Sequence, residues 1–251
     1  MPHTKFQPPE LDANSVLNDL VLPSRANQTW PYSGFDSPEN AVDLAAFENY
    51  AHPVQYKFNS RGFRDQEWPA DLQGVIWCVG DSFTLGMGAP ETHTWPHCLS
   101  QLTGRRCINV SMDGASNDWI RRRALQIWHE LEPDWICVQW SFLHRRENPD
   151  TDLTDEDRRI WNVFATVDED RDNFIDAVTA LEQTCGHSVI HSTIPLFSNN
   201  AIVRELTLQQ LVRNFVPYFD RLDYSRDGFH YDHDTAQWVA ERMAQIITHK
   251  Y

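Results

Sequence analysis

The sequence is poor in the features of disulfide-bonded or membrane-bound proteins. Its five cysteines show no Cys-x-x-Cys spacing, and an odd cysteine count fits a reducing compartment. No apolar run reaches the 18 residues of a membrane-spanning helix, and the first residues lack the apolar stretch of a secretory signal. We therefore expect a cytoplasmic protein with no membrane span, and later release or incorporation into a larger assembly is left open.

Positive charge is also scarce. The chain has 36 acidic residues against 21 lysines and arginines, which gives a net charge of −15. Because a phosphate backbone repels so acidic a surface, this composition argues against nucleic-acid binding. The glycines Gly80, Gly86 and Gly88 match neither GxxxxGK[ST] nor GxGxxG, so they do not form a phosphate-binding loop.

The chain does have a globular composition, in two parts. Hydrophobic residues make up 41%, and ten tryptophans and thirteen phenylalanines can fill a core. Eight of the fourteen prolines lie within residues 1–73, where a short helix is expected over residues 41–49 after Ser37-Pro38-Glu39. We expect residues 1–73 to be an N-terminal extension packed on a main domain of residues 74–251. Four aromatic residues would otherwise be exposed: Trp30, Tyr32, Phe35 and Phe47.

The main domain alternates short apolar runs with segments of helical spacing. This alternation predicts an α/β fold, in which helices cover both faces of a parallel sheet. The expected strands are residues 75–79, 107–110, 135–139 and 188–191. The expected helices are residues 94–102, 117–131, 172–184, 202–215 and 235–248.

Several segments that could form a site follow the ends of these strands. Ser82, Gly114, the stretch Ser141–Arg145 and Ile194-Pro195 each come directly after an expected strand. In open parallel sheets the ligand crevice lies at the carboxyl ends of the strands. We therefore expect these residues to converge on one active site.

A serine, a histidine and an aspartate are suited to nucleophilic catalysis. A serine hydroxyl is a weak nucleophile at neutral pH and needs a base, which a third group must hold in the right tautomer. Ser82 would be the nucleophile, His230 the base and Asp227 the group that orients it. The alternatives are a helix N-cap for Ser82, a surface position for His230 and a turn for Asp227.

The chain resembles the SGNH (GDSL-type) hydrolases over about residues 75–245. Gly80-Asp81-Ser82-Phe83-Thr84 is similar to the family's first block, Asp113-Gly114-Ala115-Ser116-Asn117 to its second, and Asp227-Gly228-Phe229-His230 to its last. Asn59–Arg64 also resembles a segment that precedes the serine block in some members. The resemblance implies a flavodoxin-like three-layer α/β/α sandwich, with Ser82, His230 and Asp227 as catalytic residues and the backbone N–H of Gly114 in the oxyanion hole.

One block departs from the family pattern. The usual Gly-x-Asn-Asp after the third strand, whose asparagine is an oxyanion donor, is absent, and the chain reads Val138-Gln139-Trp140-Ser141-Phe142-Leu143-His144-Arg145. The backbone N–H of Ser82 and Gly114 would remain as donors. The third donor would be Asn117, or else Ser141, His144 or Arg145.

The resemblance implies an ester hydrolase that works through an acyl-enzyme and needs no cofactor. The substrate class expected first is small acyl esters of a carbohydrate, and lipids and thioesters are expected second. Two alternatives are a non-catalytic binding or structural protein on the same fold, suggested by the missing block, and an acyltransferase using the same serine. The extension would form a lid or a pocket wall. The sequence predicts no oligomeric state.

Four further features have more than one interpretation. Residues 150–172, with nine acidic residues against three arginines, are expected to be a solvated surface or else a flap beside the site. The arginines 121–123 would lie on a solvated or salt-bridged helix, or else form an anion site. Trp140 and Phe142 would line a pocket or fill the core. The run from His230 to Asp234 suggests a metal site, but we expect no metal there, and Asp232 or Asp234 would cap the last helix.

Overall fold

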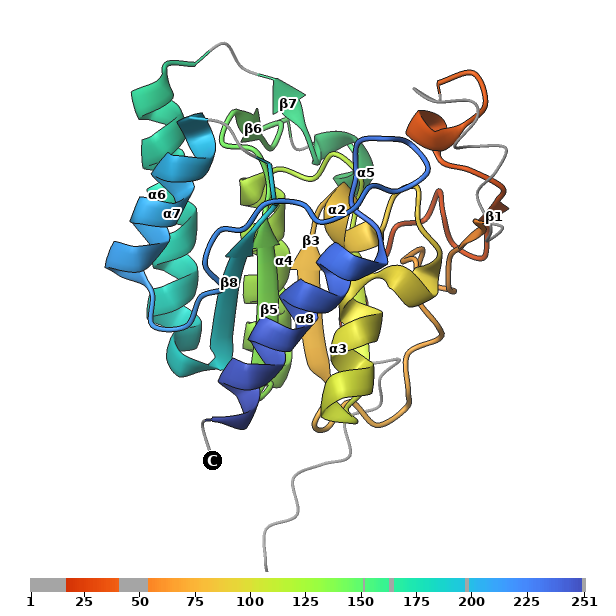
Figure 1. The fold of residues 1–251 in the computed structure, drawn as a ribbon, viewed down its shortest axis with the longest axis horizontal. Coiled ribbons are helices and arrows are strands. Elements are labelled where there is room, and N and C mark those ends of the chain that lie inside the picture. The colour runs from red at the N-terminus through yellow and green to blue at the C-terminus, as the bar shows by residue number, and fades with distance from the viewer. Residues whose placement is uncertain (1–16, 41–53, 151, 163–164, 197–198, 250–251) are drawn as a thin grey trace, which may run out of the picture.

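Four buried strands form a parallel sheet at the centre of the protein (Figure 1). They are β3 (Ile76–Gly80), β4 (Cys107–Ser111), β5 (Trp135–Trp140) and β8 (Val189–Thr193), in the order β4-β3-β5-β8. Every residue in them is buried, because helices cover both faces, and this explains why the strands are continuous apolar runs rather than alternating ones. The four predicted strands are confirmed.

The computed structural model describes residues 17–40, 54–150, 152–162, 165–196 and 199–249. The helix predicted over residues 41–49, and with it Phe47, lies outside the described residues. Within the described ranges, no helix has the length and apolar character needed to cross a membrane.

The helices form two layers around the sheet. On one face α4 (Asn117–Leu131), α6 (Val167–Cys185) and α7 (Asn199–Leu211) share a hydrophobic core with the strands. On the other face α3 (Trp95–Thr103) and α8 (His233–Thr248) share a second core. This arrangement is the predicted flavodoxin-like α/β/α sandwich, which is confirmed.

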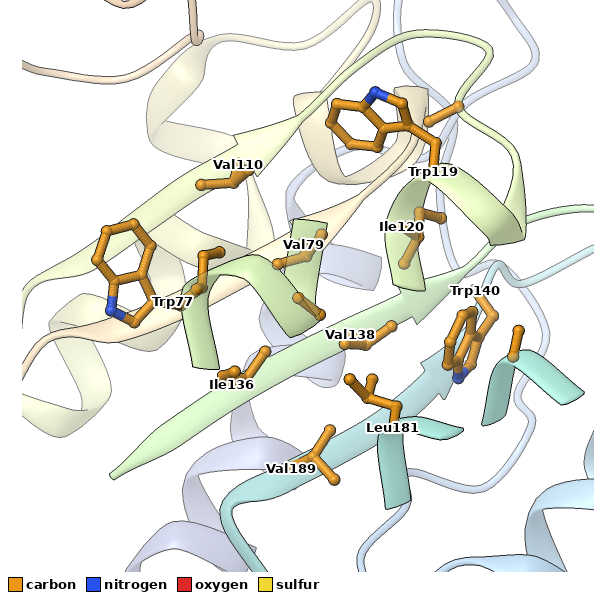
Figure 2. Close-up of a cluster of buried hydrophobic side chains, with 14 of the residues drawn as sticks. Trp77, Val79, Val110, Trp119, Ile120, Ile136, Val138, Trp140, Leu181 and Val189 are labelled. Atoms are coloured by element: carbon orange, nitrogen blue, oxygen red, sulfur yellow. The ribbon is translucent and has the colours of Figure 1, made fainter. Parts of the chain in front are cut away.

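Side chains from alternate strand positions fill the two cores. Figure 2 shows Trp77 and Val79 of β3 beside Ile136 and Val138 of β5, on the face that α4 and α6 cover. Trp140 lies in this core, fully buried, and its Nε1–H donates to Nδ1 of His191 at 3.1 Å. Core packing is therefore the correct interpretation of Trp140, and a pocket-lining role is wrong.

Two helices differ from their predicted bounds for identifiable reasons. The helix α6 begins at Val167 rather than at residue 172, because Thr166 and Glu169 form a capping box that starts it earlier. The helix α7 ends at Leu211 rather than at residue 215. The residues after it pair with the free edge of β8, where His191 N donates to Asn214 O at 3.0 Å and Val216 N to His191 O at 2.8 Å.

Short elements complete the described structure. These short elements are β1 (Thr29–Trp30), η1 (Gly34–Asp36), β2 (Tyr56–Lys57), α2 (Ser82–Leu85), η2 (Glu91–His93), β6 (Arg145–Arg146), α5 (Asp155–Arg158), β7 (Trp161–Asn162) and η3 (Gly186–Ser188). Among them, β1 pairs with β2 and β6 with β7, both antiparallel.

Residues before the sheet contribute to the same core as the sheet. Leu20, Leu22 and Phe63 belong to the cluster that α4 and α6 share with the strands. The Arg64 guanidinium is buried and donates to the backbone carbonyls of Leu85, Gly86 and Ala89, directly after α2. The division of the chain at residues 73 and 74 stays a prediction.

Candidate active site

Ser82 lies at the first position of α2, directly beyond the carboxyl end of β3. Asp81 is the N-cap residue, and its Oδ1 accepts a hydrogen bond from Phe83 N at 3.0 Å. The N-cap position considered for Ser82 is therefore wrong, and its hydroxyl is free for another partner. The turn is so tight that a Cβ at Gly80 would lie 2.1 Å from Oγ1 of Thr84, which only glycine avoids.

The loop between α7 and α8 brings His230 and Asp227 to this serine. The Ser82 Oγ lies 2.8 Å from His230 Nε2, and His230 Nδ1 lies 2.6 Å from Asp227 Oδ2. All three side chains are nearly buried, with 5% of Ser82, 3% of His230 and 2% of Asp227 exposed. The structure thus joins into one hydrogen-bonded chain the three residues that the sequence singled out.

The surroundings of Asp227 keep its carboxylate ionised. Burial alone would raise the pKa of this carboxyl, but the hydrogen bond and charge of His230 and two backbone N–H groups lower it below its usual value. Asp227 Oδ1 accepts from Phe229 N at 2.8 Å, from His230 N at 2.9 Å and from the Ser225 hydroxyl at 2.9 Å. An ionised Asp227 holds the proton of His230 on Nδ1 and leaves Nε2 free to accept the Ser82 proton.

Two backbone N–H groups of the predicted oxyanion hole are available. Gly114 follows β4 with a left-handed φ of 72°, a conformation that glycine adopts without strain. Within the described part of the chain, neither the Ser82 N–H nor the Gly114 N–H has an acceptor. Such free N–H groups can stabilise an oxygen that develops negative charge.

Asn117 connects the start of α4 to the backbone after β5. Its Oδ1 accepts from Ser141 N at 2.8 Å, and its Nδ2 donates to Phe142 O at 3.1 Å. These two bonds fix the orientation of a fully buried amide, and no residue in the described ranges accepts the second hydrogen on Nδ2.

The other possible donors are placed differently. The Ser141 hydroxyl donates to Asp81 Oδ2 at 2.6 Å, so its only hydrogen is used. Arg145 Nη1 donates to Ser141 Oγ at 2.8 Å and to Asp81 Oδ2 at 3.1 Å. The His144 side chain is exposed to solvent on one side. Desolvation of the rest of it, together with the charge of the nearby Arg145, lowers the pKa of its imidazole.

The sequence did not predict these bonds of Ser141 and Arg145 with Asp81, which connect the end of β5 to the end of β3. Asp81 is fully buried, and its carboxylate accepts hydrogen bonds from the Ser141 hydroxyl and from Arg145. Arg204 of α7 was also missed, and its Nη1 donates to Ser141 O at 3.0 Å. Burial lowers the pKa of Arg204 to about 10. A charged residue at a strand end needs a partner when buried, which was the available signal for Asp81.

The acidic segment of residues 150–172 is anchored beside Gly114. Ser116 N donates to Arg159 O at 2.9 Å, and Arg159 Nε donates to Asp113 O at 2.8 Å. Arg122 and Arg123 of α4 both bind the carboxylate of Asp155 in α5. Arg122 also binds Glu147, and Arg121 lies 3.9 Å from Asp118. The arginine run therefore lies on a salt-bridged helix, and two of its three residues bind this segment.

The side chain that caps the start of α8 comes from outside the run after His230. Asp232 is the N-cap residue, but its side chain makes no capping bond, and its Oδ1 lies 2.6 Å from His93 Nδ1. The carboxylate of Asp223 accepts from Asp234 N at 2.7 Å and Thr235 N at 3.2 Å instead. Among the described residues, no group of three or more His, Cys, Asp or Glu side chains could hold a metal ion.

Comparison by sequence finds no relative. No protein-family model matches the chain, and no curated protein does. The family resemblance of the three short blocks is therefore not accompanied by detectable similarity along the chain.

Comparison of structures does find relatives. TesA aligns with a TM-score of 0.50 at 15% identity over 70% of this chain and 99% of its own. A family two carbohydrate esterase from Clostridium thermocellum in complex with cellohexaose aligns with a TM-score of 0.50 at 12% identity, over 73% of this chain and 66% of its own. A protein assigned to the lipolytic G-D-S-L family, from Desulfitobacterium hafniense, aligns with a TM-score of 0.46 at 12% identity over 69% and 99%.

The two matches with a TM-score of 0.50, at identities of 15% and 12%, concern the fold. The chain has the SGNH-type hydrolase fold. The residues that resemble the family's first two blocks follow the carboxyl ends of β3 and β4, and those that resemble its last block lie in the loop before α8.

Proposed function

We propose that the protein is a serine ester hydrolase, with Ser82 as nucleophile, His230 as general base and Asp227 as the group that orients His230. The observation that carries this proposal is the hydrogen-bonded chain from Ser82 Oγ to His230 Nε2 (2.8 Å) and from His230 Nδ1 to Asp227 Oδ2 (2.6 Å). A nucleophile within reach of its base, and a base within reach of a third group, is the arrangement that acyl transfer requires.

The reaction proceeds in two halves. Ser82 Oγ attacks the acyl carbonyl carbon while His230 takes the hydroxyl proton, and that proton then passes to the leaving alcohol as the ester C–O bond breaks. Water next attacks the acyl-enzyme and gives one proton to His230. The acid leaves as the proton returns to Ser82. Asp227 stabilises the imidazolium in both halves without taking its proton.

The oxyanion is held by the backbone N–H of Ser82, the backbone N–H of Gly114 and the Asn117 amide. Asn117 takes the place of the missing asparagine after β5, because its bonds to Ser141 N and Phe142 O hold it at the end of that strand with one hydrogen that no described residue accepts. Ser141 is disfavoured because its hydrogen is bound to Asp81. Arg145 is the alternative third donor, since its bonds to Ser141 and Asp81 use Nη1 and not Nε or Nη2.

Small acyl esters of a carbohydrate, acetyl esters first, are the substrates to test. The fold shared with the Clostridium thermocellum carbohydrate esterase supports this choice. No step of the mechanism uses a cofactor or a metal ion.

A fluorophosphonate probe tests the proposal directly, because it reacts covalently with activated serines. Peptide mapping by mass spectrometry is expected to find the adduct on Ser82, and Ser82→Ala and His230→Ala are expected to abolish it. Ser100→Ala is the matched control, since Ser100 lies on α3 with its hydroxyl bound to Arg105 O, and it is expected to be labelled like the wild type.

The same experiment separates the alternatives. A folded protein that is neither labelled nor able to hydrolyse 4-nitrophenyl acetate would contradict the enzyme and favour a binding protein on this fold. Labelling at Ser82 together with faster release of product when an alcohol is added would favour acyl transfer over hydrolysis.

A further inference from the structure

A closed ring of hydrogen bonds joins the N-terminal extension to both halves of the candidate active site. Gly88 N donates to the Tyr56 hydroxyl at 2.6 Å, and that hydroxyl donates to Asp36 Oδ2 at 2.8 Å. Arg226 Nη2 donates to the same oxygen at 2.5 Å. Arg226 N donates to Gly88 O at 3.0 Å and closes the ring.

The ring is buried and charged, so its geometry is strongly constrained. Asp36 and Tyr56 have no exposed surface, and Arg226 is 8% exposed. The second oxygen of Asp36 accepts from Ser33 N at 2.5 Å, so the carboxylate is bonded at both oxygens. If the ring were displaced, the buried carboxylate would lose a partner and its charge would be left without compensation. Because this costs free energy, displacement of the ring is unfavourable.

Each member from the main domain is tied to a catalytic residue. Arg226 directly precedes Asp227, and Gly88 follows Ser82 on the loop that leaves α2. The two loops touch closely, since a Cβ at Gly88 would lie 2.3 Å from Ser225 Oγ and 3.1 Å from Asp227 N. Ser225 N also donates to His230 O at 2.9 Å, so residues 225–230 form one hydrogen-bonded loop.

We propose that Asp36 of the extension is a positioning residue, which sets the distance between Ser82 and the Asp227–His230 pair through Arg226, Tyr56 and Gly88. The candidate active site is then incomplete without the extension. This inference rests on the proposed function. It gives the extension a role in catalysis that differs from a lid or a pocket wall.

The test compares three single substitutions in the extension. Asp36→Asn keeps the shape of the side chain but removes the charge that binds Arg226. Tyr56→Phe removes the hydroxyl that accepts from Gly88 N–H and keeps the aromatic side chain. Glu67→Gln is the matched control, because this exposed carboxylate bonds Ser60 outside the ring. The rate of fluorophosphonate labelling at Ser82 is expected to fall roughly ten- to hundredfold in the first two variants and to be unchanged in the third, because small misplacements of reacting groups are costly.

A second measurement separates positioning from loss of stability and does not depend on activity. The proton on His230 Nδ1, bound to Asp227, is followed by NMR as a low-field resonance, assigned by its loss in His230→Ala. In Asp36→Asn and Tyr56→Phe, at temperatures where circular dichroism shows folded protein, this resonance is expected to move or broaden. Glu67→Gln is expected to leave it in place.

The outcomes are distinguishable from those of the proposed function. Wild-type labelling rates together with an unmoved resonance in both ring variants would overturn the inference and leave the esterase proposal standing. A wild-type protein that is not labelled, with a resonance that moves in the ring variants, would reject the esterase proposal and support the positioning role. An unmoved resonance in a protein that is not labelled would reject both.

Discussion

At the residue scale, Asn117 has two separable properties. Its Oδ1 accepts the Ser141 N–H, which holds the backbone after β5, and its Nδ2 has the hydrogen assigned to the oxyanion. A carboxylate at this position keeps the acceptor for Ser141 N–H, but it loses both the hydrogen assigned to the oxyanion and the bond to Phe142 O. Its negative charge would also oppose the oxyanion.

We expect Asn117→Asp to lower kcat by at least about 10²-fold, which is the usual cost of losing one oxyanion donor, with little change in KM. Steady-state kinetics on 4-nitrophenyl acetate measures both constants. Arg145→Gln serves as the comparison, and a larger loss of kcat in that variant than in Asn117→Asp would assign the third donor to Arg145 instead.

At the element scale, the helices α2 and α3 end in the same way but in different surroundings. Gly86 caps α2 with a φ of 80°, and Gly104 caps α3 with a φ of 65°. A Cβ at Gly86 would lie 2.4 Å from Cγ2 of Thr94, whereas a Cβ at Gly104 would have no atom within 4 Å. Alanine at either position has the same backbone strain, and only Gly86→Ala adds a steric clash.

Gly104→Ala is expected to cost about 1 kcal/mol of the free energy of unfolding, from left-handed strain alone. Gly86→Ala is expected to cost about 2–4 kcal/mol, because overpacking adds to the strain, and to slow labelling of Ser82 by moving α2. Urea denaturation compares the two variants with the wild type. Equal losses of stability would show that the contact with Thr94 relaxes at no cost.

At the scale of the whole molecule, the pH dependence of stability has a contribution from one buried carboxyl. Burial raises the pKa of Asp65 from 3.8 to about 6, although Arg106 lies 2.7 Å away and Asn109 N donates to it at 3.1 Å. In the unfolded chain this carboxyl returns to its usual pKa. Between these two values the folded state binds more protons than the unfolded state, so stability falls as the pH rises.

The wild type is therefore expected to lose about 2 kcal/mol relative to Asp65→Asn between pH 4 and pH 7, mostly below pH 6. Urea denaturation of both proteins at several pH values measures this difference, in which the repulsion among the other acidic residues largely cancels. Asp71→Asn, at an exposed position, is the control and is expected to show a much smaller change. A stability difference for Asp65→Asn that stays constant with pH would contradict the expectation.

The sequence by itself determined the sheet, its layers and the three residues of the hydrogen-bonded chain. Short apolar runs such as Val75–Val79, followed by glycine and separated by segments of helical spacing, indicate central strands covered on both faces. The carboxyl ends of parallel strands meet at one edge, so residues that follow them, such as Ser82, are brought together by topology alone. His230 and Asp227 could be assigned because their spacing suits an acid and a base on one short loop.

The tertiary structure decided which polar groups bind one another. Nothing in local sequence connects Asp81 to Ser141 and Arg145, or Asp36 to Arg226, because these pairs form between segments far apart in the chain. The sequence expected a helix through residue 215, but residues after Leu211 pair with the edge of β8 instead. Local patterns encode burial and periodicity, whereas the partner of a buried charge depends on which distant segment the folded chain brings within about 3 Å of it.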